Sequence, residues 1–563
     1  MNGATSQFRR RFAGRGAVKA SSVWLALFVL NSALTFQNRW PTVGVRWAPE
    51  FSIELAALLL ASVLVAAWRG SLGRRWRNAV LAGFIILTLG RYLDVTVPAL
   101  MGRSIHLYWD SQHIPAVAAL FLDRVASWRI WLGGAALLAL LAVLFAILRW
   151  AVGTVVTALA SAPSRRALGI LSLILLLLYG VGRLNPRPAI QALFAPPVTA
   201  MLVEQVRLVL AATVFRDNRW IAVQPPLPVS NLDRLRRGDV FVIFLESQGA
   251  LVFDVPRFAD PLAGDFATLE RALADAGWLT ASARVESSTF GGSSWLAHSS
   301  LLSGLRIANQ GDYYDLLASS RPTLVSRFAA AGYRSVALMP GLRYAWPEGQ
   351  FYGFASILDA ARLDYRGPAY SGWIIPDQYS LYRLHRTEVE PANRPPLFVF
   401  FPTLNSHAPF APTPPYNPDW SRFDAPLTAA PGEAGLNERL DGEALAAAYI
   451  QSVRYNLAVL GGYLRQHASA NALFVVLGDH QPPAIVGGRD ISWQTPVHVF
   501  SRDPELIGAF QAAGFRAGMT PGPTVLGGVE SLGPLLLRTL HHPPDAPVTR
   551  SEAHDGPARP YPP

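Results

Sequence analysis

Cysteine is absent from the 563 residues of this chain. Disulfide bonds, thiolate nucleophiles and cysteine-ligated metal sites are therefore excluded. Charged residues are also scarce, at 15% against a usual share of about 25% for soluble domains, while 51% of the residues are hydrophobic. This deficit of charge argues against a purely soluble protein, and the length allows about three or four domains.

The net charge of +11 is unevenly distributed along the chain. Residues 1–183 hold 19 Lys and Arg against 5 Asp and Glu, a balance of +14, and the remainder holds 30 against 33, a balance of −3. The positive excess thus lies in the most hydrophobic part of the chain, where it can orient helices in a membrane. We therefore expect no nucleic-acid partner.

Five apolar runs of 14 to 21 residues, nearly free of charge, lie in the first third of the chain: 23–36, 51–68, 79–99, 130–148 and 167–182. Four or five such runs can cross a hydrocarbon core of about 30 Å. The first is the shortest, and a cleaved signal peptide is its alternative, although its polar flank lacks a small-residue cleavage site. We predict a cytoplasmic tail over residues 1–20 and an α-helical transmembrane bundle of five spans over residues 21–183.

Basic residues beside these runs set the predicted orientation. The flanks on one side of the membrane hold 12 Arg and Lys, and the opposite flanks hold 5: Arg39, Arg46, Arg103, Arg124 and Arg129. Because cytoplasmic loops carry the excess of basic residues, the N-terminal tail is expected in the cytoplasm. An odd number of spans then places everything after Gly182 outside. This predicts a multi-pass protein of the bacterial inner (plasma) membrane with a periplasmic C-terminal domain.

Two polar features interrupt the membrane part. Arg91 and Asp94 lie on one helical face near the outer end of the third run, where they can form an ion pair. Such a pair either anchors the helix at the interface or marks a functional site. The loop over residues 102–113 gathers histidine, tyrosine, tryptophan and aspartate, which fits either an interfacial aromatic belt or a lipid-headgroup contact.

Residues 184–236 form a connector. After Pro196 and Pro197, valine, leucine and methionine mix with Glu204, Arg207 and Arg216. This pattern predicts an amphipathic helix that lies on the outer membrane surface or packs on the globular domain.

From residue 237 onward, apolar strand patterns alternate with helical ones. Strands are expected over residues 239–245, 333–339, 396–404, 472–478 and 497–501, and helices over residues 266–276, 324–331 and 442–466. Continuous Val, Phe and Leu in the strands imply an α/β domain over residues 237–541, with a mostly parallel sheet covered by helices on both faces. The Pro-rich residues 542–563 are predicted to be a disordered tail.

Polar side chains follow three of these strands, at the sheet edge where ligands gather. Glu246 follows the strand 239–245, His407 lies just beyond 396–404, and Asp479 and His480 follow 472–478. A single acid at a strand end usually caps a helix or bonds a loop, but three coinciding ends favour a site. Glutamate, aspartate and histidine are ligands suited to Mn²⁺ or Zn²⁺.

Residues 287–304 supply a candidate nucleophile. Gly291 and Gly292 permit close backbone approach, and the residues from Ser294 to 303 have a helical pattern. A hydroxyl at a helix N-terminus faces free backbone N–H groups that can cradle a phosphate, and a metal ion lowers the pKa of such a hydroxyl. The alternative is a serine that only caps the helix.

The order of these motifs resembles the alkaline phosphatase/sulfatase superfamily. The motifs are a strand ending in LES at 245–247, a hydroxyl residue opening a helix that ends in LLSG, an SHxPF stretch at 406–410 and a strand followed by GDH at 478–480. With five preceding spans, the chain is most similar to the lipoteichoic acid synthase and phosphoglycerol transferase branch. The resemblance implies one divalent ion, Mn²⁺ or Zn²⁺ with Mg²⁺ as a third candidate, and the metal ligands Glu246, Ser294, Asp479 and His480. It also implies Ser294 as the nucleophile and His407 and Trp346 as substrate-binding residues.

The sequence departs from that family at several positions. The usual nucleophile is threonine, and Thr289 and Ser293 lie close by, but Ser294 stands at the expected distance before LLSG. Glu348 follows Trp346 where the family has arginine. The stretch from Ser294 to His298 lacks the proline and arginine of a sulfatase C/S-x-P-S-R motif, which argues against cleavage of sulfate esters.

These residues predict a membrane-anchored phosphotransferase. Its donor would be a membrane phospholipid, with phosphoglycerol favoured as the headgroup, and its acceptor a glycan or lipid. His407 or His298 would move protons or bind the headgroup. Transfer of phosphoethanolamine to lipid A or a glycan, hydrolysis of a phosphodiester, and an inactive ligand-binding scaffold are the alternatives. The sequence does not indicate an oligomeric state.

Overall fold

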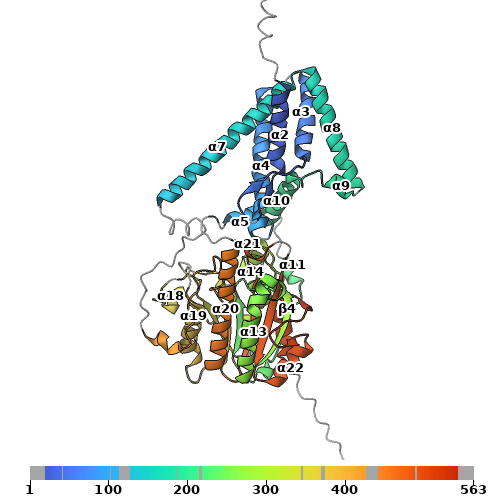
Figure 1. Cartoon of the computed structure of the whole chain (residues 1–563). Coiled ribbons are helices and arrows are strands. Elements are labelled where there is room, and N and C mark those ends of the chain that lie inside the picture. Colours follow the sequence, from blue (N-terminus) through green and yellow to red (C-terminus); the bar gives the residue numbers. More distant parts are fainter. Residues whose placement is uncertain are drawn as a thin grey trace, which may run out of the picture.

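The computed structural model describes residues 19–40, 42–70, 72–101, 103–112, 114, 127–185, 187–214, 219–343, 346–368, 370, 375–425, 442–488 and 491–542. A group of long helices from the N-terminal part adjoins an α/β domain (Figure 1). The tails predicted over residues 1–20 and 542–563 lie almost entirely outside the described residues, as do parts of the loop 102–113.

All five predicted apolar runs form helices: α2 (Ala20–Thr35), α3 (Ile53–Arg69), α4 (Arg74–Met101), α7 (Ser127–Ala158) and α8 (Ala162–Leu184). Within the described residues, α4, α7 and α8 are long and apolar enough to cross a membrane. The helix α3 begins at its N-cap Ser52 and ends at Gly70, which leaves 17 residues. Because 17 residues extend only about 26 Å at 1.5 Å each, this helix falls short of a full span. Three candidate spans are therefore found, and the count of five stays a prediction.

Two shorter helices, α5 (Leu107–Gln112) and α10 (Val198–Thr213), lie at the end of the bundle that faces the α/β domain (Figure 1). Buried Gln205 of α10 donates to the Ile105 carbonyl and accepts from the Leu107 N–H, both at 2.8 Å. The helix α10 also packs on α4, where Gly90 lies against Val198. The connector helix thus packs on the candidate membrane helix α4, while its Val203 is 68% exposed.

The α/β domain is built on a nine-stranded sheet with the order β10-β4-β9-β8-β3-β7-β5-β6, and β11 beside β4. The strands are β3 (Val240–Leu245), β4 (Leu279–Glu286), β5 (Arg334–Met339), β6 (Ser356–Asp359), β7 (Leu397–Pro402), β8 (Leu473–Gly478), β9 (Gln494–Ser501), β10 (Arg516–Ala517) and β11 (Val525–Gly528). The central strands β8, β3, β7, β5 and β6 are parallel, and β9 runs antiparallel to β8 and β4. The predicted α/β architecture is confirmed, as a mixed sheet that is mostly parallel.

Helices cover both faces of this sheet because side chains of each strand alternate between the faces. In β3, Phe241 and Ile243 enter a core shared with α13 (Pro256–Asp275) and α20 (Gly442–Gln466). Val242 and Phe244 enter the opposite core, which contains residues of α14 (Ser294–Ser303), α16 (Leu324–Ala330), α22 (Pro504–Ala512) and α23 (Leu532–Thr539). Burial on both faces explains the continuous apolar sequence of the strands.

Candidate active site

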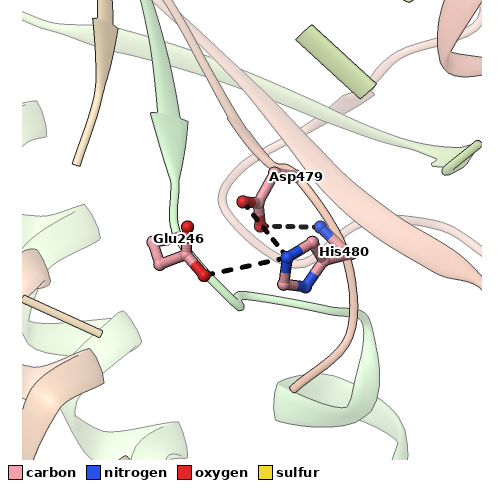
Figure 2. A group of neighbouring side chains, drawn as sticks. All are labelled: Glu246, Asp479 and His480. Atoms are coloured by element: carbon pink, nitrogen blue, oxygen red, sulfur yellow. Dashed lines mark hydrogen bonds and ion pairs between the residues drawn. The ribbon is translucent and has the colours of Figure 1, made fainter. Parts of the chain in front are cut away.

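Two neighbouring strand ends bring a buried glutamate, aspartate and histidine together. Glu246 follows β3, and Asp479 and His480 follow β8, whose Gly478 is paired with Leu245. One ligand atom from each residue lies within 4.8 Å of the others (Figure 2). The exposed fractions are 8% for Glu246 and 1% for the other two. The convergence expected from the parallel sheet is therefore present.

Hydrogen bonds orient Asp479 and His480 and leave one acceptor atom of each, Oδ2 and Nε2, without a donor. Asp479 Oδ1 accepts from the backbone N–H groups of Ser247 and His480, at 2.8 and 2.7 Å. Its Oδ2 is buried and has no hydrogen-bond partner among the described residues. His480 Nδ1 lies 2.7 Å from the Gln481 carbonyl and must donate to it, so neutral His480 presents an unprotonated Nε2. That Nε2 lies 3.5 Å from Asp479 Oδ2 and 3.7 Å from Glu246 Oε1.

This donor set fits a divalent cation. Burial and the neighbouring Glu246 carboxylate raise the pKa of Asp479 to about 6. Burial opposes ionisation of Glu246 as well, but the imidazoles of His480 and His407 hold its pKa below the ordinary value. Two buried carboxyl groups and an orphaned oxygen are costly unless a cation compensates them. The backbone bond at His480 Nδ1 is of the kind that orients metal-ligating histidines.

Ser294 lies in the same cluster, at the first residue of α14. Its hydroxyl donates to Glu246 Oε2 at 3.1 Å, and the oxygen lies 3.1 Å from His480 Nε2. The residues beside the cluster have left-handed backbones, with φ of 56° at Ser247 and 61° at Ser293. Such strained conformations in non-glycine residues concentrate at functional sites.

The hydroxyl of Thr289, one of the two alternatives to Ser294, is hydrogen-bonded to another group. Thr289 is 3% exposed, and its Oγ1 donates to the Gly292 carbonyl at 2.6 Å. Its hydrogen bond therefore shapes the loop that precedes α14. Of the two hydroxyls, Ser294 is the one in contact with the Glu246 and His480 side chains.

His407 lies on the loop after β7, which the neighbouring chain segments hold in place. Its Nδ1 lies 2.7 Å from the Ala408 carbonyl. Beneath it, Ser406 Oγ donates to the backbone carbonyl of Glu246. The buried carboxylate of Asp377 accepts from the N–H groups of Leu404 and Asn405, at 2.8 and 2.9 Å. These bonds tie the histidine loop to the end of β3.

His298 and Trp346 are not among the three clustered ligands, although His298 is close enough to Asp479 and His480 to interact with their charges. The His298 ring lies against Phe244 and Phe400, with centroid distances of 4.5 and 5.5 Å. Burial lowers the pKa of His298 to about 4, so its imidazole is neutral at pH 7. Trp346 stacks on Tyr352 and borders a cavity with Phe354. The roles given to these two residues from the sequence remain predictions.

Sequence reasoning missed the residues that support the site. Asp377 sits at the start of α19 (Asp377–Leu384), where an acid reads as an ordinary helix-terminal residue. Its contacts with Leu404 and Asn405 arise only through tertiary folding. For Asn405 and Ser406, the one sequence signal of a supporting role was that they directly precede His407.

A cavity of about 310 Å³ adjoins Ser294 between α14 and the segment around α5. Residues on both sides of the serine, Ser293 and Trp295, border it. Two further tryptophans, Trp109 of α5 and Trp493, complete an aromatic wall, and Asn309 and Gln310 add amide groups. Charged side chains, among them Arg103, Asp110 and Arg306, also border it, so the pocket combines aromatic surface with polar and charged groups that can fix a ligand.

The α/β part of the chain is similar to known proteins. Residues 239–499 match the Sulfatase family model. Similar solved structures include the lipoteichoic acid synthase LtaP from Listeria monocytogenes, at 14% identity and TM-score 0.36, covering 57% of this chain and 77% of that chain. The phosphoglycerol transferase GacH from Streptococcus pyogenes is 13% identical, with TM-score 0.34 and coverage of 59% and 90%.

A protein of the alkaline phosphatase superfamily from Vibrio parahaemolyticus is 17% identical, with TM-score 0.31 and coverage of 47% of this chain. The match spans 60% of the Vibrio chain. No curated protein matches the sequence. The matched residues 239–499 contain the motifs on which the superfamily resemblance rests, so the chain is similar to the Sulfatase family over this part of its length.

Proposed function

We propose that the protein is a membrane-anchored, metal-dependent phosphotransferase of the inner membrane, acting on the periplasmic side. It moves the phosphorylated headgroup of a phospholipid, phosphoglycerol in first place, through Ser294 to an envelope glycan or lipid. The observation that carries this proposal is the position of Ser294 Oγ, 3.1 Å from both Glu246 Oε2 and His480 Nε2 at the start of a helix.

The metal would be held by Glu246, Asp479, His480 and Ser294. An ion of the Mn²⁺ or Zn²⁺ type, with Mg²⁺ as a further candidate, would supply a lowered hydroxyl pKa at Ser294 and neutralise phosphoryl oxygens. The chain itself supplies N–H groups at the start of α14, which favour an anionic phosphoryl group.

In the first half-reaction, Ser294 Oγ forms a bond to phosphorus and the bond from phosphorus to the diacylglycerol oxygen breaks. The serine proton has an acceptor in Glu246 Oε2, and the diacylglycerol oxygen takes up a proton as it leaves. In the second half-reaction, the oxygen of an acceptor hydroxyl forms a bond to phosphorus and the bond from phosphorus to Ser294 Oγ breaks. The acceptor hydroxyl gives up its proton, and Ser294 Oγ takes one up, so the serine hydroxyl is restored. We assign His407, on the loop after β7, to binding the headgroup or supplying the proton of the leaving group.

Other acceptors and headgroups use the same machinery. Phosphoethanolamine transfer to lipid A or a glycan differs only in the headgroup, and hydrolysis differs only in using water as the acceptor. The cavity beside Ser294 favours an organic acceptor over water, because it offers aromatic surface together with amide, hydroxyl and charged groups that can hold a polar organic molecule.

Intact-mass spectrometry tests the proposal. The full chain in detergent, supplied with Mn²⁺ or Zn²⁺ and incubated with phosphatidylglycerol and phosphatidylethanolamine but no acceptor, should gain the mass of one phosphoglycerol group. Peptide mapping should place that group on Ser294, and Ser294→Ala should gain nothing. A chain that neither gains mass nor releases diacylglycerol from either lipid would contradict the proposal.

A further inference from the structure

A cavity of about 600 Å³ lies where the outer end of α4 meets the α/β domain. From the membrane part it is bordered by Asn38, Arg46 and Arg91, and from the α/β domain by Phe290 and Trp493. The two parts touch directly here, because a Cβ at Gly291 would lie 2.6 Å from the carbonyl oxygen of Met101, the last residue of α4. Gly291 stands three residues before Ser294, so the cavity borders the loop that leads to the candidate nucleophile.

Two buried polar atoms at this cavity have no partner among the described residues. Arg91 is 1% exposed, and its Nε donates to the Phe36 carbonyl at 2.9 Å. Its Nη1 makes two long contacts of 3.4 Å, to Asp94 and the Pro196 carbonyl, while Nη2 is unpaired. Asn38 donates through Nδ2 to the Thr42 carbonyl, and its Oδ1 is unpaired.

Basic residues outnumber acidic ones in the lining of the cavity. Arg46 and Arg91 border it, and Asp94 is the one acid among the described residues that line it. Two more acids near Arg91 do not line the cavity, and each accepts a hydrogen bond from a neutral group. Glu50 Oε2 accepts from Gln37 at 3.1 Å, and Glu54 Oε1 accepts from the Thr199 N–H at 3.1 Å. A buried guanidinium with a free N–H group is costly unless an anion reaches it.

We propose that this cavity binds a phosphate ester that also carries a hydroxyl or ammonium group, presented as the headgroup of a phospholipid. The phosphate accepts from Arg91 Nη2 and meets the charge of Arg46, and the hydroxyl or ammonium donates to Asn38 Oδ1. A lipid is the source because the cavity opens at the end of an apolar helix, within reach of the membrane surface.

This inference rests on the proposed function and adds a place where the donor lipid is recognised. Trp493 borders both this cavity and the aromatic cavity beside Ser294. Phe290 contacts Trp493, with ring centroids 5.7 Å apart. The two rings therefore form the partition between the lipid side and the nucleophile side.

Binding measurements on the full chain with Ser294→Ala, which removes turnover, test the inference. Short-chain phosphatidylglycerol, short-chain phosphatidylcholine and sn-glycerol phosphate are titrated by calorimetry in detergent. Exposed Arg46→Glu should weaken phosphatidylglycerol binding by about tenfold, as expected for loss of one charge-assisted contact. The matched control is Arg39→Glu, an exposed arginine of the same hairpin that does not border the cavity, and it should bind within about twofold of the parent.

Arg91→Gln should weaken binding at least as much as Arg46→Glu. If Arg91→Gln lowers the thermal midpoint, its loss of binding can come from destabilisation, and the test then rests on Arg46→Glu. Equal affinities for Arg46→Glu and Arg39→Glu would overturn the site, as would phosphatidylcholine binding as tightly as phosphatidylglycerol. Glycerol phosphate binding as tightly as the lipid would overturn the lipid source. Because turnover is not measured, failure of the wild type to form an adduct on Ser294 would contradict the proposed function and leave this result standing.

Discussion

The hydroxyl of Ser294 is the only protein oxygen nucleophile in contact with both the Glu246 and His480 side chains among the described residues. We expect Ser294→Ala to abolish turnover and the covalent adduct while the fold is retained, because Ser294 follows the N-cap Ser293 and its partly buried hydroxyl loses only side-chain hydrogen bonds, a cost of about 1 kcal/mol. Initial rates and circular dichroism measure the two effects.

Thr289→Ala is the matched control for that prediction. It removes a buried hydroxyl five residues away whose bond goes to Gly292, so a moderate loss of rate with the adduct retained is expected. An active Ser294→Ala variant together with an inactive Thr289→Ala variant would move the nucleophile to position 289.

The residues around Ser294 should separate into two groups by metal content. Glu246→Ala, Asp479→Ala and His480→Ala each remove one of three clustered ligands, so bound metal should fall well below one ion per chain and activity by orders of magnitude. His407→Ala should keep its metal and lose transfer, because His407 is assigned to the substrate. Elemental analysis of the purified variants distinguishes the groups, and full metal in Asp479→Ala would remove Asp479 from the ligand set.

The sequence alone could predict which side chains meet where residues with metal-binding side chains directly follow strands. Glu246, Asp479 and His480 stand directly after apolar strands, so parallel pairing alone predicted that they would meet. Asp377 could not be found in this way, because its partners Leu404 and Asn405 are distant in sequence and its own surroundings read as a helix start. Trp346 was assigned by resemblance alone, and its contact with Tyr352 gives no independent support.

At the scale of elements, the loop after β7 depends on Asp377. Both carboxylate oxygens accept a backbone N–H, so Asp377→Asn puts an amide nitrogen opposite one of these donors. We expect a loss of about 1–3 kcal/mol in the free energy of unfolding. Turnover should fall by about tenfold, corresponding to about 1.4 kcal/mol in the barrier, with bound metal unchanged. Asp359→Asn, where Oδ1 alone accepts from Arg362, is the matched control; an equal loss of rate in both variants would contradict the positioning role.

Strands with continuous apolar residues were predicted to within one or two residues at most ends. A strand that is buried on both faces is apolar along its whole length, so the limits of the apolar run mark the limits of the strand. The strand β4 was not predicted, because its sequence LTASARVE is rich in small and polar residues. Its place is fixed by antiparallel pairing with β9 across eight residue pairs, which is a non-local effect. The span count depends on two short apolar helices: α2 has 16 residues, and α3, which begins at its cap Ser52 and ends at Gly70, has 17.

At the scale of the whole molecule, buried histidines should make stability depend on pH. Burial lowers the pKa of His498 to about 4, against an unfolded value of about 6.5. Between these values the unfolded chain binds more protons than the native chain, so stability should fall as pH drops from about 6.5 toward 4. His498→Phe should reduce the slope of the thermal midpoint against pH in that window, whatever its effect at pH 7.5. An unchanged slope would show that this residue does not titrate on unfolding.

Topology is the remaining whole-molecule property, and the absence of cysteine makes it directly measurable. Three spans (α4, α7 and α8) or five both place the α/β domain outside a cytoplasmic N-terminus, but they differ for the hairpin between α2 and α3. With five spans the hairpin lies outside, and with three it lies inside. Residues Asn38 and Arg46 of this hairpin border the same cavity as Trp493 of the α/β domain, so we expect the hairpin and the domain on one side.

Single cysteines introduced at exposed Thr42 and exposed Gly73 test this arrangement in intact cells. A membrane-impermeant maleimide applied to spheroplasts should label Thr42→Cys at once and Gly73→Cys only after lysis, because Gly73 lies in the Arg-rich connection before α4. Labelling of both positions only after lysis would place the hairpin inside. It would then contradict the packing of the hairpin beside the α/β domain, because a bilayer would have to separate residues that line one cavity.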